Sequence, residues 1–208
     1  MLLLDFLRKT LIGVGKNNIE IQKGLNVRCS ISGENNTVKI FGCDDKKKIK
    51  TKIKIKINGN NNTVNIKGIK TGKRLYIGVG STTPCEGINI EIGNNFTCVD
   101  TTILAYQHNV PIKIGDDCLF SKDVIIRSGE LPHQIYDTIT GENLDNSNGI
   151  SIGNHVWIGE SVYIMKKVKI SDNSIVGSAS VVTRKFDEEN VVIAGNPAEI
   201  RRRNISWK

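Results

Sequence analysis

The sequence predicts an all-β fold in which short strands and turns wind into stacked triangular coils, that is, a parallel β-helix. An aliphatic residue recurs every six positions in the second half of the chain, and a twelve-residue segment is repeated in the first half. The 20 glycines and only 4 prolines predict many turns with positive φ and few interrupted strands. The 208 residues suit one domain or one repeat array.

The strictest repeat lies between residues 152 and 182. Neither the 3.6-residue period of a helix nor the alternation of a plain strand generates a spacing of six. A strand, a turn and another strand do, and three hexads close one triangular coil. Because one coil cannot bury its aliphatic face alone, stacking of coils stabilises the fold. The repeated residues are Ile152, Ile158, Ile164, Ile170, Val176 and Val182, and small or apolar residues hold the fifth positions, Val156, Val162, Val168, Ser174 and Ser180.

The repeat is less regular upstream. Residues 31–42 (ISGENNTVKIFG) and 57–68 (INGNNNTVNIKG) are identical at eight of twelve positions, as expected for adjacent turns of a solenoid. The Asn-Asn pairs at 35–36 and 61–62 favour left-handed turns and predict side-chain ladders between coils. Two further triplets keep the spacing of six: Ile92, Cys98 and Leu104, and Ile114, Phe120 and Ile126.

Two segments break the period. The interval from Ile126 to Ile152 is not a multiple of six, so we expect about residues 127–151 to leave the coil as an excursion loop. The coil domain is expected to span residues 1–190. Because Asn196-Pro197 predicts a turn and a helix start, residues 191–208 are expected to form a C-terminal turn and a short capping helix.

The net charge and the cysteine content of the chain indicate which binding partners and which cellular compartment to expect. The net charge of +8 favours an anionic partner, although a lysine-rich surface that only keeps the protein soluble explains it equally well. Five cysteines without a CxxC pair indicate reduced thiols in a cytoplasmic protein. The first residues, MLLLDFLRKTLIGV, carry charges within an apolar run. They predict a short amphipathic helix or cap, with membrane contact at most peripheral.

The motifs from about residue 120 onward resemble a known family. VWIGES, VGSASV, VVTRK and VIAGNPAEIRR are similar to segments of the hexapeptide-repeat acyltransferases, in particular the branch of galactoside, maltose and capsule O-acetyltransferases. The small size, the lysine-rich first half and LPHQIYD are most similar to the bacterial capsular polysialic acid O-acetyltransferases. The resemblance implies a left-handed β-helix, an exception to the usual right-handed crossover. It also implies a homotrimer with acetyl-CoA between subunits.

The resemblance implies an acetyl-CoA-dependent O-acetyltransferase acting on an acidic capsular polysaccharide, with sialic acid residues of polysialic acid as the expected acceptor. Transfer from a thioester to a hydroxyl requires a base and a donor to the developing oxyanion. His133, in the excursion loop, matches the base, with His108 and His155 as alternatives. Trp157, in VWIG, is expected to donate its N–H to the thioester carbonyl and to form a wall of the pantetheine site; corner packing is the alternative.

The resemblance also implies the cofactor contacts, and no metal is expected. The two arginines suit the phosphates of the cofactor, whereas the small serine lets the pantetheine arm lie close to the coil. Lys166 and Lys167 stand where relatives often have Pro-Gly, and their role stays open. The expected cofactor-binding residues are Trp157, Ser178, Thr183, Arg184 and Arg202.

The segment KKKIKTKIKIKIN (46–58) alternates lysine with apolar residues and predicts a strand with one apolar and one cationic face. Such closely spaced like charges call for a counter-charge, which a polyanionic sugar would provide. Lys50, Lys52 and Lys54 are therefore candidate substrate-binding residues. Protection of a sheet edge against aggregation explains the lysines equally well.

Other functions remain open at this point. The acceptor could be a small neutral sugar, or the chain could be a non-catalytic β-helix binding protein. A zinc hydratase of the same fold needs three histidine ligands, two of them close in sequence, but here His108, His133 and His155 are far apart in the chain. No nucleic-acid partner is expected, because aromatic residues are not interleaved with the lysines.

Overall fold

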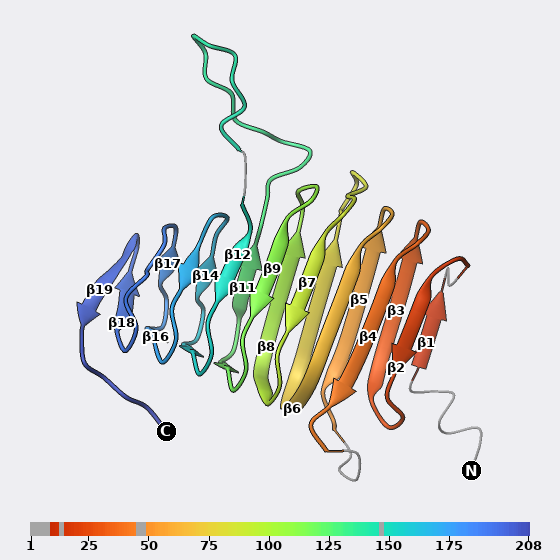
Figure 1. The fold of residues 1–208 in the computed structure, drawn as a ribbon, viewed down its shortest axis with the longest axis horizontal. Helices are drawn as coiled ribbons and strands as arrows, with labels where there is room; N and C mark the ends of the chain where they lie inside the picture. Colours follow the sequence, from red (N-terminus) through yellow and green to blue (C-terminus); the bar gives the residue numbers. More distant parts are fainter. Residues whose placement is uncertain (1–8, 13–14, 45–48, 146–147) are drawn as a thin grey trace.

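The computed structural model describes residues 9–12, 15–44, 49–145 and 148–208. These residues form nineteen strands and no helix, and the strands join in one curled sheet (Figure 1). All-β coils were predicted, and this is confirmed. Among the described residues, nothing resembles an apolar helix of the length needed to cross a membrane.

The sheet has three faces because each coil turns at three corners. The first face contains β1 (Lys9–Ile12), β3 (Asn26–Ser32), β5 (Lys52–Asn58), the end of β6 (Thr63–Val79), the end of β8 (Phe96–Ala105), β11 (Val124–Arg127), β14 (Tyr163–Ile164) and β17 (Val181–Val182). The second contains β2 (Asn18–Ile21), β4 (Thr37–Gly42), the start of β6, β7 (Asn89–Ile92), β9 (Pro111–Ile114), β12 (Ile150–Ile152) and β15 (Lys169–Ile170). The third contains the middle of β6, the start of β8, β10 (Leu119–Phe120), β13 (Trp157–Ile158), β16 (Ile175–Val176) and β18 (Val192–Gly195), and ends with β19 (Ala198–Arg202).

The pairing of strands between neighbouring coils explains why the hexads are regular in one part of the chain and not in another. Trp157 pairs with Ile175, which lies three hexads further along the chain, so three hexads make one coil, as predicted. In the first half the coil length varies: Lys9 pairs with Val27 after three hexads, but Val27 pairs with Ile53, more than four hexads away. The longer coils obscure the spacing of six, but they preserve the echo between residues 31–42 and 57–68, which stack on each other.

The core lies inside the coils. All six aliphatic residues of the strict repeat and all five residues at the fifth positions are buried, as are Cys98 and Cys118. Leu104 is the exception among the expected inward residues. The alternation of β8 shifts after Cys98, so that Ile103 and Ala105 point inward and Leu104 is half-buried.

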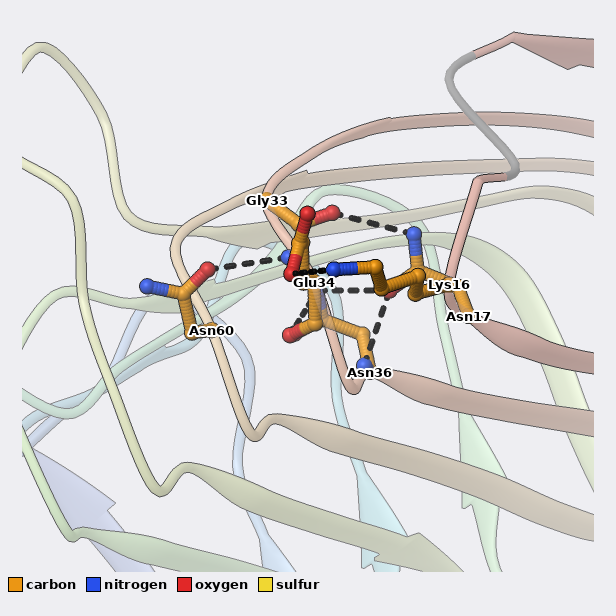
Figure 2. A network of polar contacts seen from close by, with 6 residues as sticks. All are labelled: Lys16, Asn17, Gly33, Glu34, Asn36 and Asn60. Carbon is orange, nitrogen blue, oxygen red and sulfur yellow. Dashed lines mark hydrogen bonds and ion pairs between the residues drawn. The ribbon is translucent and has the colours of Figure 1, made fainter.

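The predicted asparagine ladder is present. Asn17 Oδ1 accepts the Asn36 backbone N–H at 2.8 Å, and Asn36 Oδ1 accepts that of Asn62 at 3.0 Å. Both Asn36 and Asn62 are fully buried, and Asn35 and Asn61 before them have φ near +58° and +57°. Figure 2 shows the first part of this network, where the coil corners meet. The ladder pairs polar groups that the stacked corners bury.

Replacing Asn62 by leucine tests the ladder. Asn62 also donates to Cys85 O at 2.9 Å and accepts from Ile88 N at 3.0 Å, and leucine would leave those buried groups unpaired. Each unpaired buried group costs about 1–3 kcal/mol, so we expect a loss of about 3 kcal/mol or more in urea unfolding. Asn65→Leu, on the outward side of β6, should cost below about 1 kcal/mol. Equal losses would contradict the ladder's role.

Both ends of the chain differ from expectation. The prediction of a C-terminal capping helix is wrong. Instead, β18 and β19 form an antiparallel hairpin around Asn196-Pro197, with Ile193 opposite Ile200. Pairing with the open edge of β18 overrides the local helical tendency of residues 198–207. At the other end, Lys9–Ile12 is a strand and not part of a helix. The rest of the expected N-terminal segment lies outside the described residues.

Candidate active site

The excursion loop rises from the coils between β11 and β12 (Figure 1). Arg127, Ile150 and Ser151, which were expected to belong to the loop, lie in β11 and β12 instead. The loop leaves beside the end of β8, where Ser128 N donates to Leu104 O at 3.0 Å and Leu131 N to Tyr106 O at 3.1 Å. Arg127 pairs with Glu130 at 2.8 Å. These contacts hold the first turn of the loop on the coil.

The returning part of the loop is held by Lys166 and Lys167, the two residues whose role the sequence left open. The Lys166 ammonium pairs with Asp145, whose side chain is only 2% exposed. Asp145 also accepts the backbone N–H of Ile135 at 2.6 Å, and Lys167 Nζ donates to Leu144 O at 3.3 Å. Both lysines therefore connect the loop to the coil below it.

The ion pair gives loop docking a pH dependence. Hydrogen bonding to the Lys166 ammonium lowers the pKa of the Asp145 carboxyl below its ordinary value of about 3.9. Because the folded-state pKa is lowered, the stabilisation is fully present above about pH 3.9 and is lost as the pH falls through the lowered pKa. The loop should therefore stay docked at neutral pH and detach only in acid.

Lys166→Met should release the loop at neutral pH, since it leaves the Asp145 carboxylate without its charged partner. We expect hydrogen exchange of the amides at 133–145 to rise by about tenfold or more, with little change in the coil strands. Lys167→Met is the matched control, because this lysine is exposed and donates to a single carbonyl. Unchanged exchange in Lys166→Met would mean that other contacts hold the loop.

His133 lies in the loop with an exposed side chain. Its backbone N–H donates to Glu130 O at 2.8 Å, which fixes the turn that carries it. The same loop exposes apolar side chains, with Ile135 at 59%, Tyr136 at 54% and Ile139 at 92% exposure. Exposed apolar groups gathered in one segment are typical of a contact surface.

Trp157 begins β13 on the third face and is 39% exposed. Its Nε1 donates to Ser121 Oγ at 3.3 Å, so the indole N–H is held by one long hydrogen bond. The register continues outward from Trp157 through Ile175 and Val192 to Arg202. Strands are roughly 4.8 Å apart, so these four positions span about 14 Å of the third face.

The structure brings Trp157, Ser178 and Arg202 to the third face and its edge. Ser178 follows β16, and its Oγ accepts the backbone N–H of Glu160 at 3.2 Å. A Cβ at Gly159 would lie only 2.7 Å from Ser178 N, so the coils approach closely here. The small residues Gly159 and Ser178 thus allow the two coils to stack closely after Trp157.

Thr183 and Arg184 lie elsewhere, after β17, at the far edge of the first face. Arg184 packs over the ring of Phe186 at 5.3 Å. It lines a groove of about 450 Å³ that also includes Lys185 and Arg203. The same lining includes Ile200 of β19 and Arg203, which follows Arg202, so this groove joins the segment after β17 to the strand that carries Arg202.

His133 and Trp157 are also apart. The loop that carries His133 leaves at the corner between the first and second faces, whereas Trp157 follows the corner between the second and third. Among the described residues, no hydrogen bond or ring contact joins the two. The alternative bases lie at corners too: His108 Nδ1 accepts from Glu86 N at 3.2 Å, and His155 is half-buried.

Sequence reasoning missed Trp207. Its ring stacks on that of His155, with centroids 4.0 Å apart and planes within 10°, and lies 6.1 Å from the ring of Trp157. Its Nε1 donates to His155 O at 2.9 Å. No repeat marks Trp207, because a segment beyond the hexads carries it back to the third face.

The lysine strand has the predicted alternation. In β5, Lys52, Lys54 and Lys56 are exposed while the isoleucines between them are buried; residues 45–48 lie outside the described residues. The lysines lie on the first face, not on the third face with Trp157. Within the described part of the chain, no carboxylate pairs with them. Lys54 instead lies over the Tyr76 ring at 5.8 Å.

Residues 149–184 match the family model described as bacterial transferase hexapeptide (six repeats). Galactoside O-acetyltransferase of Escherichia coli (strain K12) is 35% identical over 116 residues, which is 56% of this chain and 55% of that protein. Polysialic acid O-acetyltransferase of Escherichia coli O1:K1 / APEC is 30% identical over 128 residues, 62% of this chain and 41% of that protein. The chain thus spans about half the length of these curated relatives.

Two solved structures match nearly the whole chain. The polySia-specific acetyltransferase NeuO has a TM-score of 0.76 at 25% identity, covering 97% of this chain and 85% of that one. The polysialic acid O-acetyltransferase OatWY has a TM-score of 0.65 at 28% identity, covering 97% and 88%. The resemblance to the hexapeptide-repeat acyltransferases is confirmed, and polysialic acid O-acetyltransferases are among the proteins that this chain resembles.

Proposed function

We propose that this hexapeptide-repeat protein is an acetyl-CoA-dependent O-acetyltransferase whose acceptor is an acidic capsular polysaccharide, with sialic acid residues of polysialic acid as the acetylated units. The likeness over 97% of the chain to two polysialic acid O-acetyltransferase structures carries the proposal. The curated relatives named above are O-acetyltransferases as well. The same likeness supports a left-handed sense for the coils.

Each proposed residue has a chemical task. His133 takes the proton of the sugar hydroxyl. At the same time the hydroxyl oxygen attacks the carbonyl carbon of the thioester, and the C–O bond forms. The Trp157 N–H gives up its long hydrogen bond to Ser121 Oγ and donates instead to the thioester carbonyl oxygen, which becomes negative during the attack. As the C–S bond breaks, His133 returns the proton to the leaving sulfur. Ser178, Thr183, Arg184 and Arg202 hold the pantetheine arm and the phosphates.

A homotrimer reconciles these tasks with the geometry. His133 and Trp157 lie at different corners of one chain, too far apart in the fold for any contact between them among the described residues. The exposed apolar side chains of the loop support contact with a neighbouring copy. We propose that the loop of one subunit places its His133 beside the third face of the next, so that each active site lies between subunits.

The test is incubation with acetyl-CoA and a panel of acidic and neutral glycans, following thiol release. Thiol release should require the acceptor. Acetyl-CoA alone, at about 100 times its Kd, should stabilise the folded protein by about 2.7 kcal/mol. Unchanged thermal stability in millimolar acetyl-CoA would contradict the proposal and would favour a non-catalytic binding protein.

A small neutral sugar is the second candidate acceptor. The 35% identity to galactoside O-acetyltransferase favours it. The same panel separates the candidates, because a neutral-sugar enzyme would turn over galactosides at least as well as sialic acid polymers. It would also show little dependence on salt, since no acceptor charge is involved.

The lysine strand predicts how a polymer would bind. If Lys50, Lys52 and Lys54 contact an anionic chain at several points, affinity should rise with chain length and fall with salt. Replacing all three by glutamine should raise the KM for long acidic glycans by about tenfold and flatten the salt dependence. The KM for a monomeric sugar and for acetyl-CoA should not change. Equal kinetics in wild type and variant would leave edge protection as the role of the strand.

A further inference from the structure

A second groove lies on the third face next to Trp157. It has a volume of about 430 Å³, and its lining includes Lys70, Asn95, Thr97, His155, Trp207 and Lys208. The register joins it to Trp157, because Thr97 pairs with Leu119 and Leu119 pairs with Trp157. Trp157 therefore separates this groove from Ser178 and Arg202, which lie toward the other end of the stack.

The segment after β19 builds one wall of the groove. It turns back along the stack (Figure 1) and is held first between β17 and β18 and then at His155. Arg203 pairs with Glu188 at 2.8 Å, Ile205 N donates to Asn190 O at 3.0 Å, and Trp207 stacks on His155. The half-buried Trp207 is thus fixed in place before any ligand arrives.

The lining combines three kinds of group. Lys70 and Lys208 are exposed cations, and among the described residues neither pairs with a carboxylate. Asn95 and Thr97 offer hydrogen-bonding side chains, and Asp117, which also lines the groove, accepts from Asn95 at 2.9 Å. Trp207 adds an aromatic surface. Such a lining fits a small polar ring that carries a negative charge.

We propose that this groove is the acceptor subsite, and that it takes a sugar bearing a carboxylate. The carboxylate lies between Lys70 and Lys208, the sugar ring packs against Trp207, and the reacting hydroxyl faces Trp157. The assignment rests on the proposed function, because Trp157 marks the expected position of the thioester. It places the single acceptor unit on the third face and leaves the lysine strand of the first face for more distant units of a polymer.

Tryptophan fluorescence tests the groove without requiring turnover. The chain has two tryptophans, so in Trp157→Phe the signal comes from Trp207 alone. Titration with N-acetylneuraminic acid should give a saturable change, and galactose should bind at least about tenfold more weakly. Adding Lys70→Gln and Lys208→Gln should weaken binding of the acid by about tenfold, since two charge-assisted contacts are lost. Lys113→Gln, an exposed lysine of β9 on the second face, is the matched control.

Kinetic measurements on protein that keeps Trp157 test whether the groove binds the acceptor, and they test this separately from whether the proposed reaction occurs. Lys70→Gln with Lys208→Gln should raise the acceptor KM by about tenfold and leave the Kd of acetyl-CoA, measured without acceptor, unchanged. Turnover with an unchanged acceptor KM would overturn the subsite. A weakened Kd for acetyl-CoA would assign the groove to the cofactor and overturn it too. Lysine-dependent binding of the acid without turnover would support the subsite while contradicting the proposed reaction.

Discussion

Replacing His133 by alanine is expected to lower kcat by about 10²- to 10⁴-fold while leaving the affinity for acetyl-CoA nearly intact. The loss is that of the general base, because a hydroxyl that keeps its proton is a poor nucleophile. His133 is exposed on the excursion loop, so its removal should not disturb the core. The measurement is thiol release at saturating acetyl-CoA and acceptor, beside the Kd of acetyl-CoA.

His108→Ala is the matched control. His108 is also exposed, and its Nδ1 accepts the backbone N–H of Glu86 at 3.2 Å, so it has a local structural role. Its loss should change kcat by less than about threefold. If His133→Ala keeps the wild-type rate at saturating acceptor, another group is the base. A large loss in His108→Ala instead would identify that group.

Replacing Trp157 by alanine should lower kcat by about 10²-fold and raise the Kd of acetyl-CoA by about tenfold. The first effect is the loss of an N–H donor to the oxyanion, and the second is the loss of the wall beside the thioester. Trp157→Phe separates them, because phenylalanine keeps an aromatic wall but has no N–H. We expect its kcat to fall and its Kd to change little.

Tyr163→Ala is the control for losing an exposed aromatic side chain. Tyr163 lies one strand further along the same coil, on the first face, and is 45% exposed. It should leave both kcat and Kd within about twofold. If Trp157→Ala lowers only the melting temperature, and turnover per folded molecule is unaltered, Trp157 is a packing residue of the coil corner.

The coils could be predicted where the repeat is strict. From residue 152 to 182 each inward residue lies above its counterpart three hexads later, so the pattern in the chain is also the pattern in space. Upstream the coil length varies, from three hexads between Lys9 and Val27 to more than four between Val27 and Ile53, and only the near-identity of residues 31–42 and 57–68 shows the stacking. Leu104 was expected to point inward because it lies six residues after Cys98. The alternation of buried residues in β8 shifts after Cys98, and the spacing of six does not record this shift.

The candidate site was predicted less completely. Resemblance pointed to His133, Trp157 and the cofactor residues, but not to how one chain distributes them over different corners. The C-terminal helix was expected from Asn196-Pro197 and the residues after it. It does not form, because β18 presents an open edge on which β19 can pair. An unpaired edge is a tertiary feature, and local propensity takes no account of it.

By itself the sequence determined the all-β coil, its hexapeptide period, the excursion loop and the cationic alternation of β5, because each depends on residues at short, fixed spacings. Only the tertiary structure decided that Lys166 holds the loop through Asp145, that the lysine strand and Trp157 lie on different faces, and that Trp207 returns to stack on His155. The last contact joins residues 52 positions apart. Such approaches depend on how many coils stack between them and where a corner turns, which no local spacing in the chain records.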